Sequence, residues 1–124
     1  MGTIRNEMTI VHDWNKVKIE KLRQDAIRTF DEGIDGGMIS PIMTSYINEE
    51  YTFIINGDCS KLGWDTSKRF HDIRMKWCEK HKHDVESIVV INFGEDGPCY
   101  IVYDNNGEDK YERLCNMGSR TNNG

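Results

Sequence analysis

The chain has 124 residues, 37% hydrophobic and 30% charged, which is enough apolar material for one folded domain and too much for a disordered chain. Its formal net charge of −5 argues against a dedicated nucleic-acid-binding protein, because such proteins are usually basic. No apolar run approaches the ~20 residues that span a bilayer, and the first residues lack the basic and apolar regions of a secretory signal. We therefore expect a cytoplasmic protein without a membrane segment.

The N-terminal part of the sequence predicts a strand followed by a helix. Residues 7–12 are a candidate for a short strand at the edge of a sheet. Asp13 is a suitable N-cap for a helix that continues to about Glu32, where Gly33 would end it. Apolar residues at helical spacing predict the buried face of this helix: Ile19, Leu22, Ala26 and Phe30.

The middle of the sequence predicts a hairpin and a second helix. Two apolar runs at 42–47 and 51–56 flank a polar triplet, as two hairpin strands flank a turn. The second helix is expected to begin at Asp65 or Thr66, because both residue types cap helices. Its buried face is predicted from the helical spacing of three residues: Phe70, Ile73 and Trp77.

The C-terminal part of the sequence is rich in β-forming residues. The nearly continuous apolar run 87–93 is typical of a central strand, 99–103 follows after a turn, and 110–114 alternates as an edge strand does. We therefore predict a single α+β domain over 1–115 and a flexible tail over 116–124. The expected order is α-β-β-α-β-β-β, with two helices on one face of a mainly antiparallel sheet of about five strands.

Charge is segregated along the chain. Residues 61–83 carry seven Lys or Arg against three acidic residues, a net of +4, so the rest of the chain sums to −9. Segregated charge points to a charged partner. Four basic residues of the second helix are candidates for binding the phosphate groups of a nucleotide or nucleic acid: Arg69, Arg74, Lys76 and Lys80. The alternative is that their long stems lie along the sheet and neutralise acidic neighbours in the same chain.

The sequence does not predict a metal site. His71, Cys78, His81 and His83 lie in or beside the second helix, but no second cluster completes a tetrahedral set of ligands. Solvent-exposed histidines at the helix end are the expected arrangement. The four cysteines contain no Cys-x-x-Cys pair, so reduced and mostly buried thiols are expected.

The sequence shows no strong catalytic motif. Asp96, Glu108 and Lys110 resemble the carboxylates and lysine of a metal-dependent nuclease. However, the two acidic residues fall in predicted turns, where Asp and its polar neighbours are common for conformational reasons. No serine stands in a Gly-x-Ser-x-Gly motif. The sequence thus favours a protein without catalytic residues or a cofactor, and leaves open a hydrolase that uses these three residues.

Aromatic residues provide a second candidate surface. Trp64 stands just before the second helix, and Tyr100, Tyr103 and Tyr111 lie on the last two predicted strands. Such side chains give a protein partner large contact areas, although they are also common as half-buried residues of a sheet. Strand alternation predicts that Tyr103 shares a face with Ile101.

These patterns favour a non-enzymatic protein-interaction module, an inhibitor or adaptor of phage or viral type that binds a partner protein. The alternative is a binder of a small anionic ligand, such as a nucleotide, or of nucleic acid through residues 65–83. A symmetric homodimer is also open, because 7–12 and 110–114 are predicted to be free edges.

Overall fold

The computed structural model describes residues 3–30, 37–94 and 98–107. In chain order the elements are β1 (Ile4–Arg5), β2 (Glu7–Asp13), α1 (Lys16–Phe30), β3 (Met43–Thr44), β4 (Tyr51–Ile55), β5 (Ser60–Lys61), α2 (Asp65–His81), β6 (Ser87–Asn92) and β7 (Tyr100–Asp104). None of the helices in these ranges is long and apolar enough to cross a membrane.

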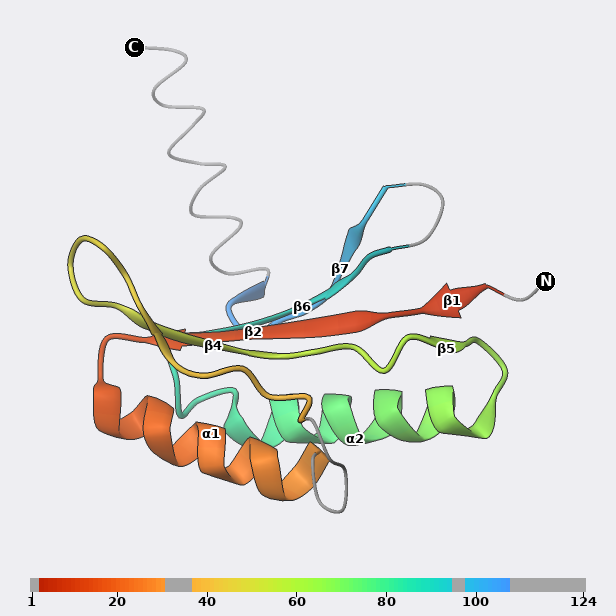
Figure 1. Ribbon diagram of the computed structural model, residues 1–124, viewed down its shortest axis with the longest axis horizontal. Helices are drawn as coiled ribbons and strands as arrows, with labels where there is room; N and C mark the ends of the chain where they lie inside the picture. The colour runs from red at the N-terminus through yellow and green to blue at the C-terminus, as the bar shows by residue number, and fades with distance from the viewer. Residues whose placement is uncertain (1–2, 31–36, 95–97, 108–124) are drawn as a thin grey trace, which may run out of the picture.

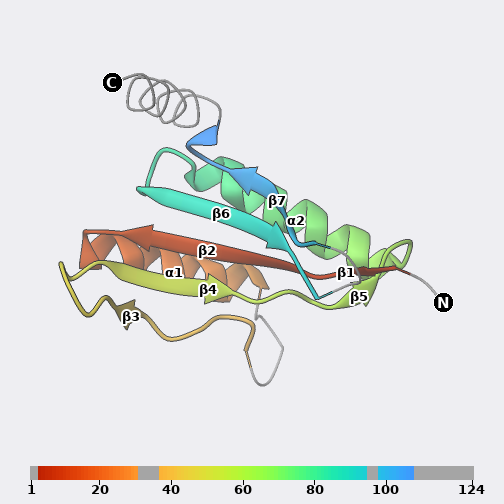
Figure 2. The same ribbon diagram turned by 90° about the horizontal axis from the view of Figure 1, so that it is seen from above.

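The main sheet has five strands in the order β3-β4-β2-β6-β7, and each neighbouring pair is antiparallel. β1 and β5 form a separate two-stranded ribbon. Both helices lie on one face of the main sheet, and neither covers the other face (Figures 1 and 2). The predicted α+β architecture, with two helices on one face of a five-stranded antiparallel sheet, is therefore confirmed.

β2 is the central strand of the sheet, whereas the sequence predicted an edge strand at this position. It pairs with β4 on one side and β6 on the other, so both of its edges are occupied. The prediction was wrong because the polar ends of β2 resemble an exposed strand. In the structure these ends are buried and have partners. Glu7 contacts His71 of α2, and Asp13 accepts hydrogen bonds from the N–H groups of Asn15 and Glu86.

Both helices bury the faces that their sequences predict. In α1 the buried residues are Ile19, Leu22, Ala26 and Phe30. In α2, Phe70 and Trp77 are buried and Ile73 packs partly against the same core. The buried face of α2 also includes Arg74 and His81, which the sequence analysis placed toward solvent. The core between helices and sheet is thus more polar than predicted.

The helix caps differ from the predicted ones. The Asn15 side chain accepts a hydrogen bond from the N–H of Lys18 at 3.1 Å, so Asn15 rather than Asp13 caps α1. At the start of α2 the N-cap residue is Trp64, which makes no side-chain capping bond, and Asp65 is the first helical residue. The negative charge of Asp65 is still favourable in the first turn, because it opposes the helix dipole.

β7 contains a bulge that changes which residues share a face. Val90 of β6 lies opposite Tyr103, while the next residue, Ile91, lies opposite Ile101, so Val102 is an extra residue in β7. Tyr103 therefore packs toward the helices and Ile101 points away from them. The prediction that these two residues share a face is wrong, because an inserted residue reverses the alternation.

The predicted hairpin is confirmed by β3 and β4, which are joined by a turn at residues 46–49. The predicted strands 87–93 and 99–103 correspond to β6 and β7. The predicted end of the first helix, the strand 110–114 and the tail 116–124 lie outside the described residues.

Candidate functional site

The side of the sheet turned away from both helices carries aliphatic residues on four strands. Ile10 of β2 lies opposite Ile54 of β4 and Val89 of β6. A second row is formed by Met8 of β2, Ile91 of β6 and Ile101 of β7, which lie opposite one another in that order. Along β2, Thr9 and Val11 are completely buried, so strand alternation puts Ile10 on the opposite side. We call the following six residues the aliphatic face: Met8, Ile10, Ile54, Val89, Ile91 and Ile101.

The aliphatic face is separate from the core beneath the sheet. None of its six residues belongs to the helix-side core or packs against it. Ile101 is 63% exposed and the other five are half-buried. An antiparallel sheet with one face open to water normally carries polar side chains on that face. An aliphatic surface is therefore unusual on a sheet face that no described helix covers.

Polar residues mark the margins of the aliphatic face. At one end His12 and Glu50 form a pair, with 2.7 Å between Nδ1 and Oε1. At the β7 edge the exposed Asp104 lies opposite Val89. Between these margins, the residues that β2, β4 and β6 contribute to the centre of the face carry no charge.

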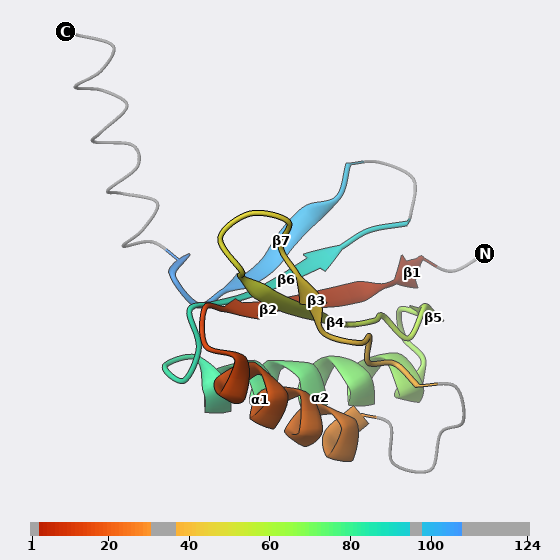
Figure 3. The ribbon, with the colours of Figure 1, turned by 60° about the vertical axis from the view of Figure 1, so that its left-hand side comes forward.

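The β3–β4 turn adds further exposed apolar surface. Tyr46 is fully exposed and Ile47 is 68% exposed. Figure 3 shows this turn rising on the same side of the sheet as the uncovered face. The sequence analysis missed both residues, because it assigned them to a strand rather than to the turn.

The structure does not gather the predicted aromatic residues into one surface. Trp64 is 53% exposed before α2, with Lys61 Nζ 5.7 Å from its ring centroid, and Tyr100 is 61% exposed at the start of β7. Tyr103 instead donates a hydrogen bond to Glu79 at 3.1 Å; burial and this contact raise the pKa of Tyr103. Tyr111 lies outside the described residues.

The predicted anion-binding residues lie in two different environments. Arg69, Lys76 and Lys80 are exposed on α2, whereas Arg74 is completely buried beneath the sheet. Lys76 and Lys80 line one hollow of about 260 Å³ between α1 and α2, beside Trp77. A ligand in this hollow would meet two of the four predicted residues.

Arg74 connects α2 to the sheet. Its guanidinium donates hydrogen bonds to the Thr9 hydroxyl at 2.8 Å and to the carbonyls of Ile55 and Asn56 at 3.3 and 2.8 Å. The guanidinium also lies over the Phe30 ring, 5.4 Å from its centroid. Burial lowers the pKa of Arg74, and nearby carboxylates partly oppose this effect. These contacts give Arg74 a structural role at the centre of the fold.

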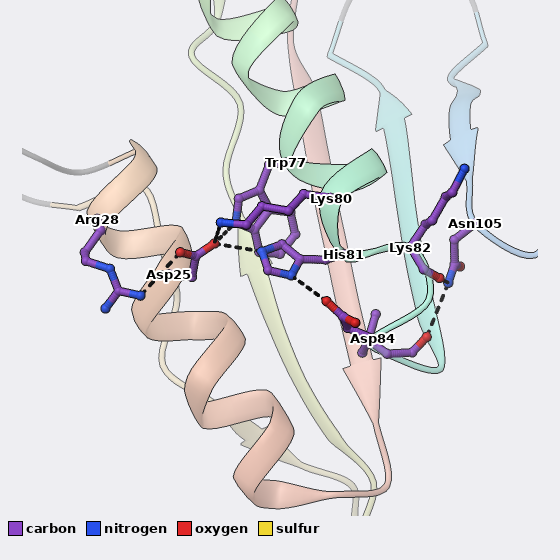
Figure 4. Close-up of polar contacts among 9 residues, drawn as sticks. Asp25, Arg28, Trp77, Lys80, His81, Lys82, Asp84 and Asn105 are labelled. Atoms are coloured by element: carbon purple, nitrogen blue, oxygen red, sulfur yellow. Dashed lines mark hydrogen bonds and ion pairs between the residues drawn. The ribbon is translucent and has the colours of Figure 1, made fainter.

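A polar cluster joins α1 to the end of α2 (Figure 4). One oxygen of Asp25 accepts hydrogen bonds from His81 Nε2 at 2.7 Å and Trp77 Nε1 at 3.1 Å, and Lys80 Nζ lies 3.5 Å away. His81 Nδ1 lies 3.1 Å from Asp84. Burial by itself raises the pKa of Asp25, but the hydrogen bond from His81 and the nearby positive charges outweigh it, and the net shift is downward.

The polar cluster is suited to holding the helices together rather than to catalysis. Both ring nitrogens of His81 face carboxylates, so neither points to a substrate, and His81 is buried. The prediction of solvent-exposed histidines at the helix end is therefore wrong for His81 and correct for His83, which is exposed.

The described residues include no group of three His, Cys, Asp or Glu side chains placed to hold a metal ion. Cys78 is buried, and burial raises its pKa to about 12. Cys59 and Cys99 are exposed free thiols, so the expectation of mostly buried cysteines is wrong for these two. The nuclease-like residues Asp96, Glu108 and Lys110 lie outside the described ranges.

Comparison of the chain with known protein families, with curated proteins and with solved structures gave no match in any of the three searches.

Proposed function

We propose that the protein is a non-enzymatic interaction module that binds a partner protein through the aliphatic face. One observation carries this proposal: six aliphatic residues share a sheet face that neither helix covers, and none of them packs against the helix-side core. Leaving apolar surface in water costs about 25 cal/mol for each Å², which a partner recovers by covering it. Tyr46, fully exposed at the adjoining turn, is the kind of anchor that interfaces use.

An inhibitor or adaptor role is the form of this function that we propose. Such proteins act by covering a surface of another protein, so they need a shaped contact face and no catalytic group. The phage or viral type and the cytoplasmic location belong to the same proposal. The phage or viral type is supported by the acidic, motif-free sequence, and the cytoplasmic location by the absence of an apolar run of the ~20 residues that span a bilayer.

The Ile10→Lys variant tests this function. A lysine at the centre of the aliphatic face puts a charge into the contact and leaves the helix-side core intact. We expect the wild-type chain to capture a partner protein from an extract of its source cells, and the variant to lose most of that partner, as quantified by mass spectrometry.

Val17→Lys is the matched control, because Val17 is 58% exposed on α1, on the opposite side of the sheet. This variant receives the same charge and is expected to retain the partner. Circular dichroism verifies that both variants are folded. Equal capture by the wild type, Ile10→Lys and Val17→Lys would contradict the assignment of the aliphatic face.

A second candidate function is the binding of a small anionic ligand or nucleic acid by α2. Lys76 and Lys80 favour it, because they line the same hollow between the helices. On this hypothesis ATP at low salt raises the melting temperature of the wild type, and high salt removes the effect. The double variant Lys76→Ala/Lys80→Ala shows no increase, whereas Lys68→Ala, exposed elsewhere on α2, behaves as the wild type. A response to ATP that the double variant shares would exclude this site.

A further inference from the structure

We infer that the partner of the aliphatic face is a second copy of this chain, which packs its own aliphatic face against the first. The inference rests on the proposed function, since it names the occupant of the same surface. In the resulting dimer the two sheets lie inside and the two helix layers outside, so that both faces of each sheet are covered.

The charge distribution supports a second copy. The chain is strongly negative outside residues 61–83, so two copies repel each other through most of their surfaces. The centre of the aliphatic face is uncharged and avoids this repulsion. Asp104 is exposed at the β7 edge, where water still reaches its carboxylate in a dimer.

The residue types also match those of a self-association surface. Interfaces between identical subunits are more apolar than those between independent proteins. The aliphatic face consists of Ile, Val and Met in two adjacent rows across β4, β2, β6 and β7. This pattern resembles one half of a hydrophobic core.

The shape of the sheet is complementary to itself. The right-handed twist of strands gives a sheet face the form of a saddle. Figure 1 shows the β3–β4 turn rising at one end of the sheet and β7 rising toward the other. A saddle fits a copy of itself that is turned over about an axis lying in the sheet, and this is the two-fold axis of a face-to-face dimer. Two sheets packed in this way lie about 10 Å apart.

The available area is compatible with a stable dimer. The five strands contain 25 residues in all, which at a rise of about 3.3 Å per residue and a strand spacing of about 4.8 Å give a flat footprint of roughly 400 Å² per copy. The relief of the side chains and the exposed Tyr46 and Ile47 add to this area. The flat footprint alone is about half of the ~800 Å² per partner of a standard interface, and these contributions raise the area toward that value.

The structure also changes which surface is available for self-association. The sequence left open a dimer formed by strand pairing at 7–12 or 110–114. β2 is the central strand, so pairing at 7–12 is wrong, and 110–114 lies outside the described residues. The proposed dimer uses the face of β2 rather than its edge.

Sedimentation equilibrium on the purified chain, from low to high micromolar concentration, tests the inference. We expect the wild type and the Val17→Lys control to have the mass of two chains. Ile10→Lys is expected to raise the dissociation constant at least about thirtyfold, as for a residue at the centre of an interface. Ile101→Lys serves as a second variant, because that side chain is 63% exposed and its replacement leaves the fold intact.

The possible results separate this inference from the proposed function. A dimer that Ile10→Lys and Ile101→Lys leave intact would overturn the inference, since another surface would then hold it. A monomeric wild type whose capture of a different protein is lost in Ile10→Lys would also overturn it, while supporting the proposed function. A monomeric wild type with no capture sensitive to Ile10→Lys would overturn both.

Discussion

Arg74→Met will lower the free energy of unfolding by about 3–5 kcal/mol, because several acceptors lose their donor and each buried acceptor left unsatisfied costs about 1–3 kcal/mol. Methionine fills much of the same space but donates no hydrogen bond. The Thr9 hydroxyl and the Ile55 carbonyl then lose their donor in a buried position, and the Asn56 carbonyl loses its donor in a partly buried one. Urea denaturation followed by tryptophan fluorescence measures the change.

The matched control for this change is Arg69→Met. Arg69 is an exposed arginine on the same helix, and its replacement is expected to change stability by less than about 0.5 kcal/mol. Adding Thr9→Val to Arg74→Met removes the hydroxyl that was left without a donor, and should recover part of the lost stability. Equal denaturation midpoints for Arg69→Met and Arg74→Met would show that the buried guanidinium does not stabilise the fold.

Asp25→Asn is expected to reduce stability at neutral pH by about 1–3 kcal/mol, because the polar cluster loses the carboxylate that faces His81, Trp77 and Lys80. The loss depends on pH in a defined direction. The pKa of Asp25 in the folded chain is lower than the ordinary value of 3.8. Its contribution is therefore complete above that ordinary value and disappears as the pH falls through the folded pKa.

Thermal unfolding of the wild type and Asp25→Asn between neutral and acidic pH measures this dependence. The difference between their melting temperatures should be largest near neutrality and should shrink below about pH 4. Asp72→Asn is the control, since Asp72 is half exposed and pairs with Lys68 at 3.6 Å. It should alter stability little at any pH. A constant difference between wild type and Asp25→Asn across this range would contradict the role assigned to the charge.

The helices and the sheet could be predicted because their apolar residues follow simple periods. Helical spacing was enough to identify Ile19 and Phe30 in α1, and Phe70 and Trp77 in α2. The apolar runs of β4 and β6 likewise identified strands inside the sheet. These patterns are local in sequence. The elements that they predict form in the structure because local preference and core packing favour the same conformation.

Features that depend on distant partners could not be predicted in the same way. Arg74 and His81 appear as solvent-facing positions in a helix pattern, yet each is buried against residues that come near only after folding. β2 appeared to be an edge strand because the partners of Glu7 and Asp13 lie far along the chain.

The aliphatic face could have been predicted from the apolar run of β6. The nearly continuous apolar run of β6 predicted only a central strand. With both helices on one face of the sheet, the same run also implies that the other face is apolar. Ile10 and Ile54 repeat this pattern on β2 and β4. Combining the predicted layer arrangement with strand alternation would therefore have located the surface.

The central position of β2 has a consequence for synthesis of the chain. β2 is made well before β6, one of its two neighbours in the sheet, and Glu7 of β2 pairs with Asn92 of β6. Pairings between such distant residues are slow to form, since a long loop has to close before they contribute. A nascent chain that stops before Ser87 lacks one side of its central strand. Folding of the sheet on the ribosome therefore waits for the synthesis of β6, and the apolar sides of β2 need protection until then.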